Sequence, residues 1–442
     1  MKFDRYKIYK EGGIPWLHKI PEHWQVERAK SIFKKMSRSI SDQDKIITVF
    51  RDGEVTLREN RRETGFTNAF EENGYQGLKK GDLVFHAMDA FAGAIGVSDS
   101  DGKATPEYLV YTPIDKSKIY IPFYGLFFRQ MALSGFVLAL GKSVRERSPR
   151  FKHTKFMTLD VPIPPIKEQK AIATYLDTKT AQIDRKIDLL TQKAQRYEEL
   201  KQSLINETVT RGLDKSVPMK DSGIEWIGEI PEHWNVQRLK DLGFLYSGLT
   251  GKAGSDFTDN HQWSCNFIPF VNIANNQYIS LSNMKKVVVA PQENQNRVKK
   301  DDLFFLMSSE NYEDIGKTSL LQSNIQSTYL NSFCKGFRFT TKRIEPSFAN
   351  YLLSSQKYRN CFAVEGKGFT RINLKIEKVR NLFFLLPPNY EQAEIAGYLD
   401  KKVEHINQII KNLDWQIKIQ KELRKSLIND VVTGKIKVTD NE

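Results

Sequence analysis

The chain has very little cysteine and no long apolar run. Only 3 of its 442 residues are cysteine, namely Cys265, Cys334 and Cys361, and no two are spaced as Cys-x-x-Cys. This pattern supports neither a disulfide framework nor a zinc site, so we expect no bound metal. The N-terminal segment has no apolar core, and no stretch approaches the roughly 20 apolar residues that span a bilayer. We therefore expect a cytoplasmic protein with no membrane partner.

Motifs for catalysis are missing as well. Gly251-Lys252 resembles the end of a phosphate loop, but Ala253 follows where Ser or Thr would hold magnesium, and Tyr246 takes the place of the first Gly. His23 and His233 recur in identical strings, yet no Cys, Ser or acidic partner is patterned with them. We expect both histidines to be structural and no residue to be catalytic.

Positive charge is in excess. Lys and Arg number 67 against 53 Asp and Glu, which gives a formal charge of +14, and the chain also has 27 Phe, 17 Tyr and 6 Trp. A folded basic protein suits a polyanionic partner such as double-stranded DNA. Charge alone leaves open the alternative that the excess only keeps a large protein soluble.

The sequence contains an internal repeat. Ile-Pro-Glu-His-Trp occurs at Ile20–Trp24 and again at Ile230–Trp234, an offset of 210 residues. A second pair of matching blocks, Pro164–Thr210 and Pro387–Thr433, has an offset of 223, so the part between the blocks is 13 residues longer in the second copy. At this length the repeat predicts two globular units with a common frame and divergent middles.

Each copy closes with a long amphipathic helix. The apolar positions of the first are Ile172, Leu176, Ile183, Ile187, Leu190, Ala194, Tyr197, Leu200 and Leu204. Those of the second are Ile395, Leu399, Ile406, Ile410, Leu413, Ile417, Leu423 and Leu427. Steps of three and four residues indicate a narrow seam of the coiled-coil kind. Pro-Pro precedes each helix and Gly212 or Gly434 follows it, which are start and stop signals.

The first helix, from about Lys167 to Val209, would be roughly 64 Å long at 1.5 Å per residue. One globular unit cannot cover such a helix. We expect the two helices to pair antiparallel about a pseudo-two-fold axis, because their seams match. The alternative is that each helix makes a separate homodimer.

The middles, residues 31–163 and 241–386, are predicted to be mixed α/β domains with many short strands. Lys79–Phe85 and Lys299–Phe305 each read as a turn followed by an apolar strand. The fold class is therefore α+β, with two mixed domains joined by two long antiparallel helices. Domains that keep a scaffold and change their loops are suited to recognising different targets.

Basic and polar loops are the candidate DNA-binding sites. In the first domain the candidates are Arg51, Arg58, Arg61, Arg62, Lys142, Arg145, Arg147, Arg150 and Lys152. In the second they are Ser247, Thr250, Lys252, Asn272, Asn275, Asn276, Gln277, Lys367, Thr370, Arg371 and Asn373. Arg reads guanine edges and Asn or Gln reads adenine edges in the major groove, whereas Lys mostly contacts phosphates.

Together these elements resemble the specificity subunit of type I restriction-modification systems. The resemblance rests on Ile-Pro-x-x-Trp before each domain and on Pro-Pro-x-x-Glu-Gln-x-x-Ile-Ala-x-Tyr-Leu-Asp after it. In the second copy, residues 247–250, 268–271 and 368–373 also resemble the opening and closing elements of a family target-recognition domain. The first copy departs from these last elements.

The resemblance implies a DNA-recognition subunit that performs no chemistry and binds no cofactor. It implies two methyltransferase subunits, which bring S-adenosylmethionine and methylate adenine, and restriction subunits that translocate and cut DNA. Each target-recognition domain would read one half of a bipartite site, while the paired helices set the spacer and dock the methyltransferase. Two alternatives stay open: a stand-alone DNA-binding regulator, and a nuclease or methyltransferase with unrecognised motifs.

The expected boundaries follow from the matched blocks. They are 1–163 for the first target-recognition domain, 164–213 for the first helix, 214–386 for the second domain, and 387–442 for the second helix and tail.

Overall fold

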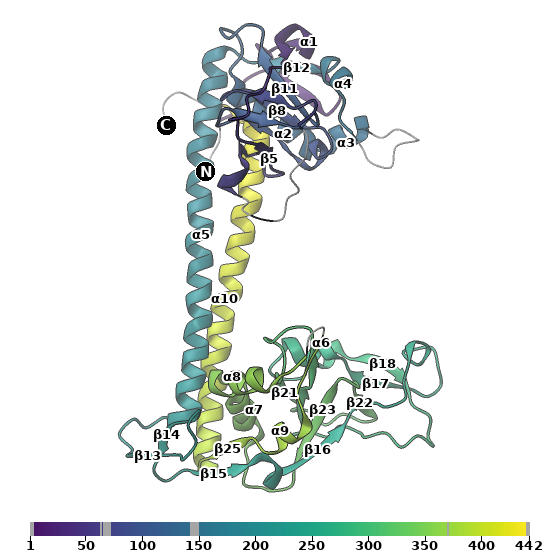
Figure 1. Ribbon diagram of the computed structural model, residues 1–442, viewed down its shortest axis with the longest axis vertical. Coiled ribbons are helices and arrows are strands. Elements are labelled where there is room, and N and C mark those ends of the chain that lie inside the picture. The colour runs from purple at the N-terminus through teal and green to yellow at the C-terminus, as the bar shows by residue number, and fades with distance from the viewer. Residues whose placement is uncertain (1–3, 62–63, 65–71, 142–149, 369–370, 439–442) are drawn as a thin grey trace. The chain divides into compact units, whose positions relative to one another are not determined.

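The computed structural model describes residues 4–61, 64, 72–141, 150–368 and 371–438 (Figure 1). Contacts divide the chain into two compact units, residues 1–190 with 415–442, and residues 191–414. Each unit is a mixed α/β domain packed on one half of both long helices, α5 (Ile166–Arg211) and α10 (Asn389–Val432). The predicted fold class is confirmed. The two helices are divided between the units because each half packs on a different domain.

The first domain is built on a four-stranded antiparallel sheet in the order β4-β11-β8-β9. Its strands are Phe33–Lys35, Tyr108–Pro113, Leu83–His86 and Ile95–Val97. Helix α2 (Ile121–Leu133) packs against β8 and β9, and its Phe128 ring meets Phe33 and Phe85 in the core. The smaller elements are β1 (Tyr9–Ile14), β2 (Leu17–Pro21), β3 (Gln25–Arg28), α1 (Ala29–Ile32), β5 (Ile47–Val49), β6 (Val55–Leu57), β7 (Gln76–Leu78), β10 (Gly102–Ala104), α3 (Phe136–Gly141), α4 (His153–Met157) and β12 (Asp160–Ile163).

The second domain repeats this plan with the sheet order β16-β23-β19-β21. Its strands are Gly243–Ser247, Cys334–Phe339, Leu303–Leu306 and Thr318–Leu320. A further three-stranded sheet has the order β18-β17-β22 (Lys285–Val288, Ser264–Ile268, Thr328–Leu330). The remaining elements are β13 (Met219–Asp221), β14 (Glu229–Pro231), β15 (Asn235–Arg238), α6 (Phe270–Asn275), β20 (Ser308–Ser309), α7 (Pro346–Ser354), α8 (Gln356–Glu365), β24 (Ile372–Asn373), α9 (Ile376–Arg380) and β25 (Phe383–Leu386).

The turn before β8 and β19 shows why the two scaffolds match. Asp82 and Asp302 accept the Lys79 and Lys299 amides at 2.8 and 2.7 Å, which closes the turn in each copy. Both carboxylates are almost fully buried. An arginine from a neighbouring segment neutralises each of them, through bonds of 3.0 Å from Arg38 Nη2 and 2.8 Å from Arg338 Nε. A buried carboxylate needs such a partner, so the motif and its arginine form one unit.

The long helices run antiparallel within each unit. In the first unit, Ile172 and Leu176 of α5 share a core with Leu427 and Val431 of α10. In the second unit, residues from the end of α5 share a core with the start of α10, including Ile205, Val209, Ile395 and Leu399. Each domain therefore holds the beginning of one helix and the end of the other, so the predicted antiparallel pairing is confirmed.

The predicted seam is wrong at one position in each helix. Leu200 and Leu423 are 52% and 38% exposed, although both were expected in the seam. The seam instead passes through the next position, where Lys201 and Arg424 lie partly buried. A helix advances 3.6 residues per turn, so a pattern of threes and fours drifts, and the sequence spacing alone could not choose between adjacent positions.

None of the described helices is long and apolar enough to cross a membrane. The three cysteines are free thiols, and the described residues contain no cluster of three His, Cys, Asp or Glu that could hold a metal ion.

Candidate nucleic-acid interface

The repeated Pro-Glu-His-Trp string attaches each domain to the first turn of a long helix. His23 Nε2 lies 2.8 Å from Glu168 Oε2, and the buried Trp24 indole donates to Glu168 Oε1 at 3.0 Å. In the second copy His233 and Trp234 contact Glu391 at 2.7 and 3.1 Å. The structural role expected for each histidine would consist of this contact with the first turn of a helix.

The glutamine that follows each glutamate completes the attachment. Gln169 accepts the Tyr120 amide and donates to the carbonyls of Lys118 and Pro164, all at 2.8 Å. Gln392 makes the same three kinds of bond in the second copy. Both amides are fully buried, so the Glu-Gln pair fixes the orientation of a domain on its helix.

In the first domain, three of the candidate arginines line one cavity of about 690 Å³. Arg51, Arg58 and Arg61 surround it together with His86 and Tyr108. The arginines come from the β5–β6 hairpin and the turn after it, whereas His86 and Tyr108 are paired residues on β8 and β11. The fold thus gathers residues that are far apart in sequence at one end of the two central strands, β8 and β11.

Acidic neighbours hold these arginines in place. Arg51 contacts Asp89 at 2.9 Å, and Arg61 bridges Asp52 and Glu54 at 2.7 Å each. Burial acts to raise the pKa of Asp52. Hydrogen bonds from the Glu54 amide and Arg61 outweigh this effect and hold the pKa below its usual value. Burial also lowers the pKa of His86, which keeps its ring neutral near pH 7. The cavity can therefore present oriented guanidinium donors to an acceptor-rich partner.

The later basic run of the first domain is described only in part. Arg150 pairs with Glu107, and the next residue, Phe151, bonds the Ala87 carbonyl at 2.9 Å, beside His86. Lys152 precedes α4. Four further candidates, Arg62, Lys142, Arg145 and Arg147, lie outside the described residues.

In the second domain, Arg371 lines a cavity of about 320 Å³ with Phe270, Phe333 and the Ser308–Asn311 segment. Its guanidinium lies 5.0 Å from the centre of the Phe333 ring. Lys367 and Asn373 exchange backbone bonds of 3.1 and 3.0 Å, which brings the ends of this loop together. Thr370 lies outside the described residues.

The residues that line this cavity do not include the Ser247–Lys252 loop. Ser247 pairs with Lys335 across the sheet, two residues from Phe333, and its hydroxyl accepts the Lys335 ammonium at 2.8 Å. Thr250 is exposed and its amide donates to Gln295. The Lys252 side chain is only 7% exposed and pairs with Glu293 at 2.6 Å, so it braces the loop.

The asparagine cluster also contains both buried and more exposed side chains. Asn272 is fully buried, and its amide bonds the Ser280 carbonyl and amide at 2.8 and 3.0 Å. Asn276 donates back to Asn272. Asn275, Asn276 and Gln277 line a different cavity, described below. Asn275 is exposed, Asn276 and Gln277 are half-buried, and none of the three lines the cavity of Arg371.

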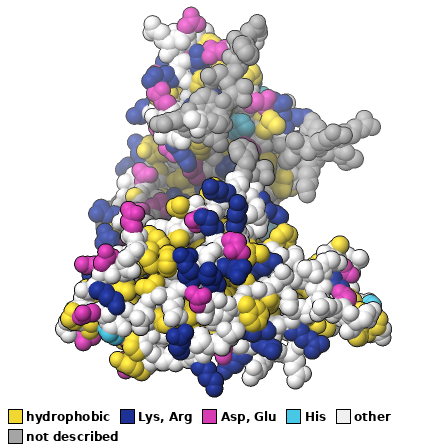
Figure 2. Space-filling model, turned by 60° about the horizontal axis from the view of Figure 1, so that its bottom comes forward, with side chains coloured by type: hydrophobic (Ala, Val, Ile, Leu, Met, Phe, Trp, Pro, Cys, Tyr) yellow, Lys and Arg dark blue, Asp and Glu magenta, His cyan; other side chains and the backbone are white. Residues whose placement is uncertain are grey.

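Basic side chains also gather in space. Figure 2 shows a group of Lys and Arg near the centre of the face formed by the second unit, which is turned toward the viewer.

Several contacts at these sites have no direct signature in the sequence. Glu168 and Glu391 were noted only as part of the repeated Pro-Pro-x-x-Glu-Gln string, although its recurrence together with identical His-Trp strings could have indicated the pairing. Arg129 of α2 and Arg424 of α10, which face one cavity, were not identified. Arg129 lies in no basic run and Arg424 stands beside Lys425 on another element, so only the fold brings the two arginines together.

Both copies of the repeat match known proteins. The family model described as "Type I restriction modification DNA specificity domain" matches residues 21–199 and 231–418. A specificity subunit of the MjaVIII type I restriction enzyme from Methanocaldococcus jannaschii is 24% identical over 288 residues, 64% of this chain and 63% of that protein. The EcoBI specificity subunit from Escherichia coli is 24% identical over 319 residues, 69% of this chain and 64% of that protein. The matches thus span just under two thirds of these relatives.

Solved structures share the fold. One chain, from a structure of a type I restriction-modification system and its complex assembly, superposes with a TM-score of 0.72 at 15% identity and covers 95% of this chain and 100% of its own. The HsdS subunit from Thermoanaerobacter tengcongensis gives a TM-score of 0.55 at 14% identity, with 95% and 99% covered. Because the family model covers well over half of the residues and matches each copy once, the chain belongs to the type I restriction-modification DNA specificity family.

Proposed function

We propose that this chain is the non-catalytic DNA-recognition subunit of a type I restriction-modification complex, in which each domain reads one half of a bipartite site. The observation that carries the proposal is that the family model matches twice, once on each domain and its following helix. The two domains share a scaffold but present different side chains. The first offers an arginine cavity, and the second offers Arg371 beside aromatic and hydroxyl groups. Unlike surfaces suit unlike half-sites.

The paired helices act as a ruler, which means that their length sets the distance between the half-sites. A helix of 46 residues, such as α5, is about 69 Å long at 1.5 Å per residue, equal to about 20 base pairs at 3.4 Å each. This length is an upper limit for the spacing of the half-sites. Glu168, Gln169 and their counterparts fix each domain on the ruler, so the spacer is set by the protein frame.

The helices also dock the methyltransferase subunits, which carry S-adenosylmethionine. On α10, Trp415, Ile419 and Leu423 are spaced four residues apart and are 63%, 44% and 38% exposed. Such a row of exposed apolar side chains on one helix indicates a protein-binding surface. The repeat offset of 223 maps it onto Gln192, Arg196 and Leu200 of α5, where the surface is more polar. The two docking surfaces are therefore unequal.

The test is to purify the chain alone and together with the methyltransferase of its host. The chain alone should neither methylate nor cleave DNA, whereas the complex should methylate adenine. Methylation or cleavage by the chain alone would support the enzyme alternative, and specific DNA binding without any stable methyltransferase partner would support the regulator alternative.

A further inference from the structure

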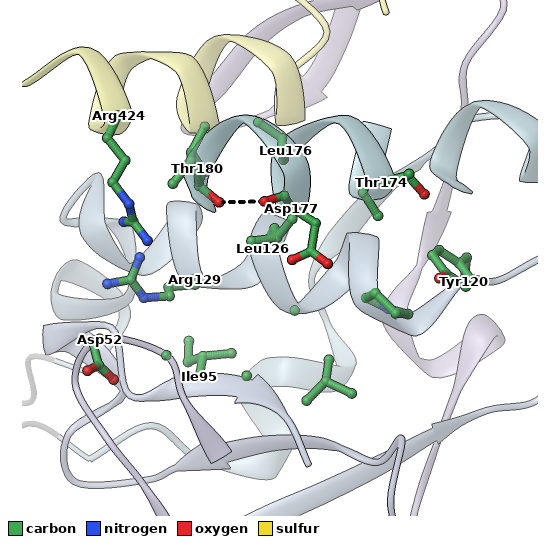
Figure 3. A pocket seen from close by; sticks show the side chains of 17 residues that line it. Asp52, Ile95, Tyr120, Leu126, Arg129, Thr174, Leu176, Asp177, Thr180 and Arg424 are labelled. Atoms are coloured by element: carbon green, nitrogen blue, oxygen red, sulfur yellow. Dashed lines mark hydrogen bonds between the residues drawn. The ribbon is translucent and has the colours of Figure 1, made fainter. Parts of the chain in front are cut away.

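Two cavities lie at equivalent places of the repeat, each where a domain meets the paired helices. In the first unit a cavity of about 340 Å³ lies between α2, α5, α10 and the turn after β5 (Figure 3). In the second unit a cavity of about 480 Å³ lies between α5, α10 and the segment after α6. Arg424 and Ile428 line the first, and the offset of 223 maps them onto Lys201 and Ile205, which line the second.

Each cavity takes its first cation from the helix seam. Arg424 lies in a seam position and contacts Asp184 at 2.8 Å. Lys201 occupies the equivalent position and contacts Glu198 at 2.6 Å and Asn407 at 3.2 Å. A charged residue in a seam costs stability relative to leucine, so its recurrence in both copies calls for a role. Fixing the register of the helices is one such role, but it does not account for the domain residues opposite.

Those domain residues leave buried donors without acceptors. Among the described residues, five buried side-chain polar atoms make no hydrogen bond, and three of them belong to residues that line these two cavities. They are Arg129 Nε in the first cavity, and Gln277 Nε2 and Arg359 Nη1 in the second. All three are donors. A buried donor without a partner is costly, and the acceptor that would satisfy it is an anion or a carbonyl oxygen.

The geometry in the first cavity strengthens this point. Figure 3 shows the guanidinium groups of Arg129 and Arg424 pointing toward each other across the opening. Burial and then the charge of Arg424 lower the pKa of Arg129, and burial lowers that of Arg359 to about 10. Both shifts express the same condition, in which positive charge is held without enough compensating negative charge.

We propose that these two cavities are phosphate-binding sites that hold the DNA backbone beside each half-site. The proposal rests on the proposed function, because it assigns the anion to DNA. Two residues connect the first cavity to the arginine cavity: Asp52 lines both, and the Arg51 carbonyl accepts from Arg129 Nη2 at 3.4 Å. A duplex read at Arg51 thus has its backbone close to Arg129.

The acidic residues of the cavities limit how the phosphate can bind. Asp52 is already paired with Arg61, and Glu198 is paired with Lys201. Asp177 of α5 also lines the first cavity and would repel an enclosed anion. A phosphate that stays attached to DNA and hydrated on one side fits this arrangement better than a buried free ion. Since each copy has one such site, each half of a bipartite target would have its own phosphate contact.

The test uses the full chain in complex with its methyltransferase and compares Arg129→Gln, Arg424→Gln, Lys201→Gln and Arg359→Gln with the exposed controls Lys116→Gln and Lys342→Gln. We expect each cavity variant to bind cognate and non-cognate duplexes about tenfold more weakly at low salt. The slope of log affinity against log salt should fall by about one per lost contact. The ratio of cognate to non-cognate affinity should stay unchanged, because phosphates carry no base identity. Arg424→Lys should stay close to wild type, which controls for folding.

A second measurement identifies the anion. Single methylphosphonate substitutions along the cognate duplex remove one phosphate charge at a time. In wild type one position on each side should weaken binding, and the corresponding cavity variant should lose this sensitivity. The phosphate assignment is wrong if each methylphosphonate weakens binding equally in wild type and in the cavity variants. It is also wrong if the variants lose the methyltransferase instead of DNA affinity. If wild type itself shows no preference for any duplex, the proposed function fails instead.

Discussion

At the scale of single residues, one carboxylate at each helix start joins a domain to the frame. Glu168 accepts hydrogen bonds from Trp24 and Tyr6 and contacts His23, whereas Glu391 contacts only the equivalent Trp234 and His233 among the described residues. Both indole rings are fully buried, so loss of the carboxylate would leave a buried N–H without its acceptor. The identical strings of the two copies are thus explained by one repeated contact.

Glu168→Ala and Glu391→Ala should each lower the free energy of unfolding by about 2 kcal/mol, because a buried donor loses its acceptor. The loss should be larger for Glu168→Ala, since Tyr6 also loses its partner. Thermal or denaturant unfolding measures the effect. Glu199→Ala on the exposed face of α5 is the control and should change stability by less than about 0.5 kcal/mol. Equal effects of all three variants would contradict the account.

Arg51 and Arg371 are the residues whose loss should alter reading of one half-site each. Arg51 is well exposed at the arginine cavity of the first domain, and Arg371 lies against Phe333 in a cavity of the second domain. Arg51→Ala should relax the requirement for one or more bases in one half of the methylated motif, at a cost of about 1–3 kcal/mol in discrimination. Arg371→Ala should relax the other half. Each variant controls for the other, and a change in both halves from either one would refute independent reading.

At the scale of elements, the antiparallel helices have the same register in both units. Asp184 lies opposite Arg424 in the first unit, and Lys201 lies opposite Asn407 in the second. A change in the length of one helix must therefore be matched in the other if the seam is to stay intact.

Insertion of one helical turn after Gln192, with a matched turn after Trp415, should lengthen the recognised spacer by about one or two base pairs, since a turn adds 5.4 Å. Mapping the methylated motif of the variant measures the spacer. A turn inserted in α5 alone is the control and should destabilise the pair because its seams no longer match. An unchanged spacer in a folded double insertion would show that the helices are not the ruler.

The exposed row on α10 predicts unequal binding of the two methyltransferase subunits. Trp415→Ala with Ile419→Ala removes apolar surface from one docking face, while the equivalent positions on α5 are Gln192 and Arg196. If two methyltransferase subunits bind per chain, as proposed, the variant should retain one, as measured by native mass spectrometry. Leu189→Ala, an exposed apolar residue on α5 outside this row, is the matched control. Retention of both subunits by the double variant would place docking elsewhere.

At the scale of the whole molecule, repetition made most of the frame predictable. The matched blocks and the three-and-four spacing predicted two mixed domains and two antiparallel helices, and both are confirmed. The seam at Leu200 and Leu423 was wrong, because spacing does not resolve which of two adjacent residues faces the partner. Asn272 and Lys252 were grouped with exposed loop residues, but their burial depends on the contacts with Ser280 and Glu293 that the fold creates.

Cavity residues that come from different elements were less predictable than loop residues. Arg51, Arg58 and Arg61 are close in sequence, so a basic run indicated them before the fold was known. Arg129 and Arg424 are 295 residues apart in the sequence and meet only because α2 and the end of α10 pack in the same unit. Loop residues can be identified from composition, whereas sites between elements require the tertiary structure.

The central claim is that two unlike domains on one frame read the two halves of one DNA site. The most direct measurement is to express the chain with its methyltransferase in a host without adenine methylation and to map methylated adenines across the genome. The account predicts one motif of two unlike halves separated by an unspecified spacer, and replacement of residues 247–386 by another target-recognition domain should change one half only. A single continuous motif, or a change in both halves after the replacement, would contradict it.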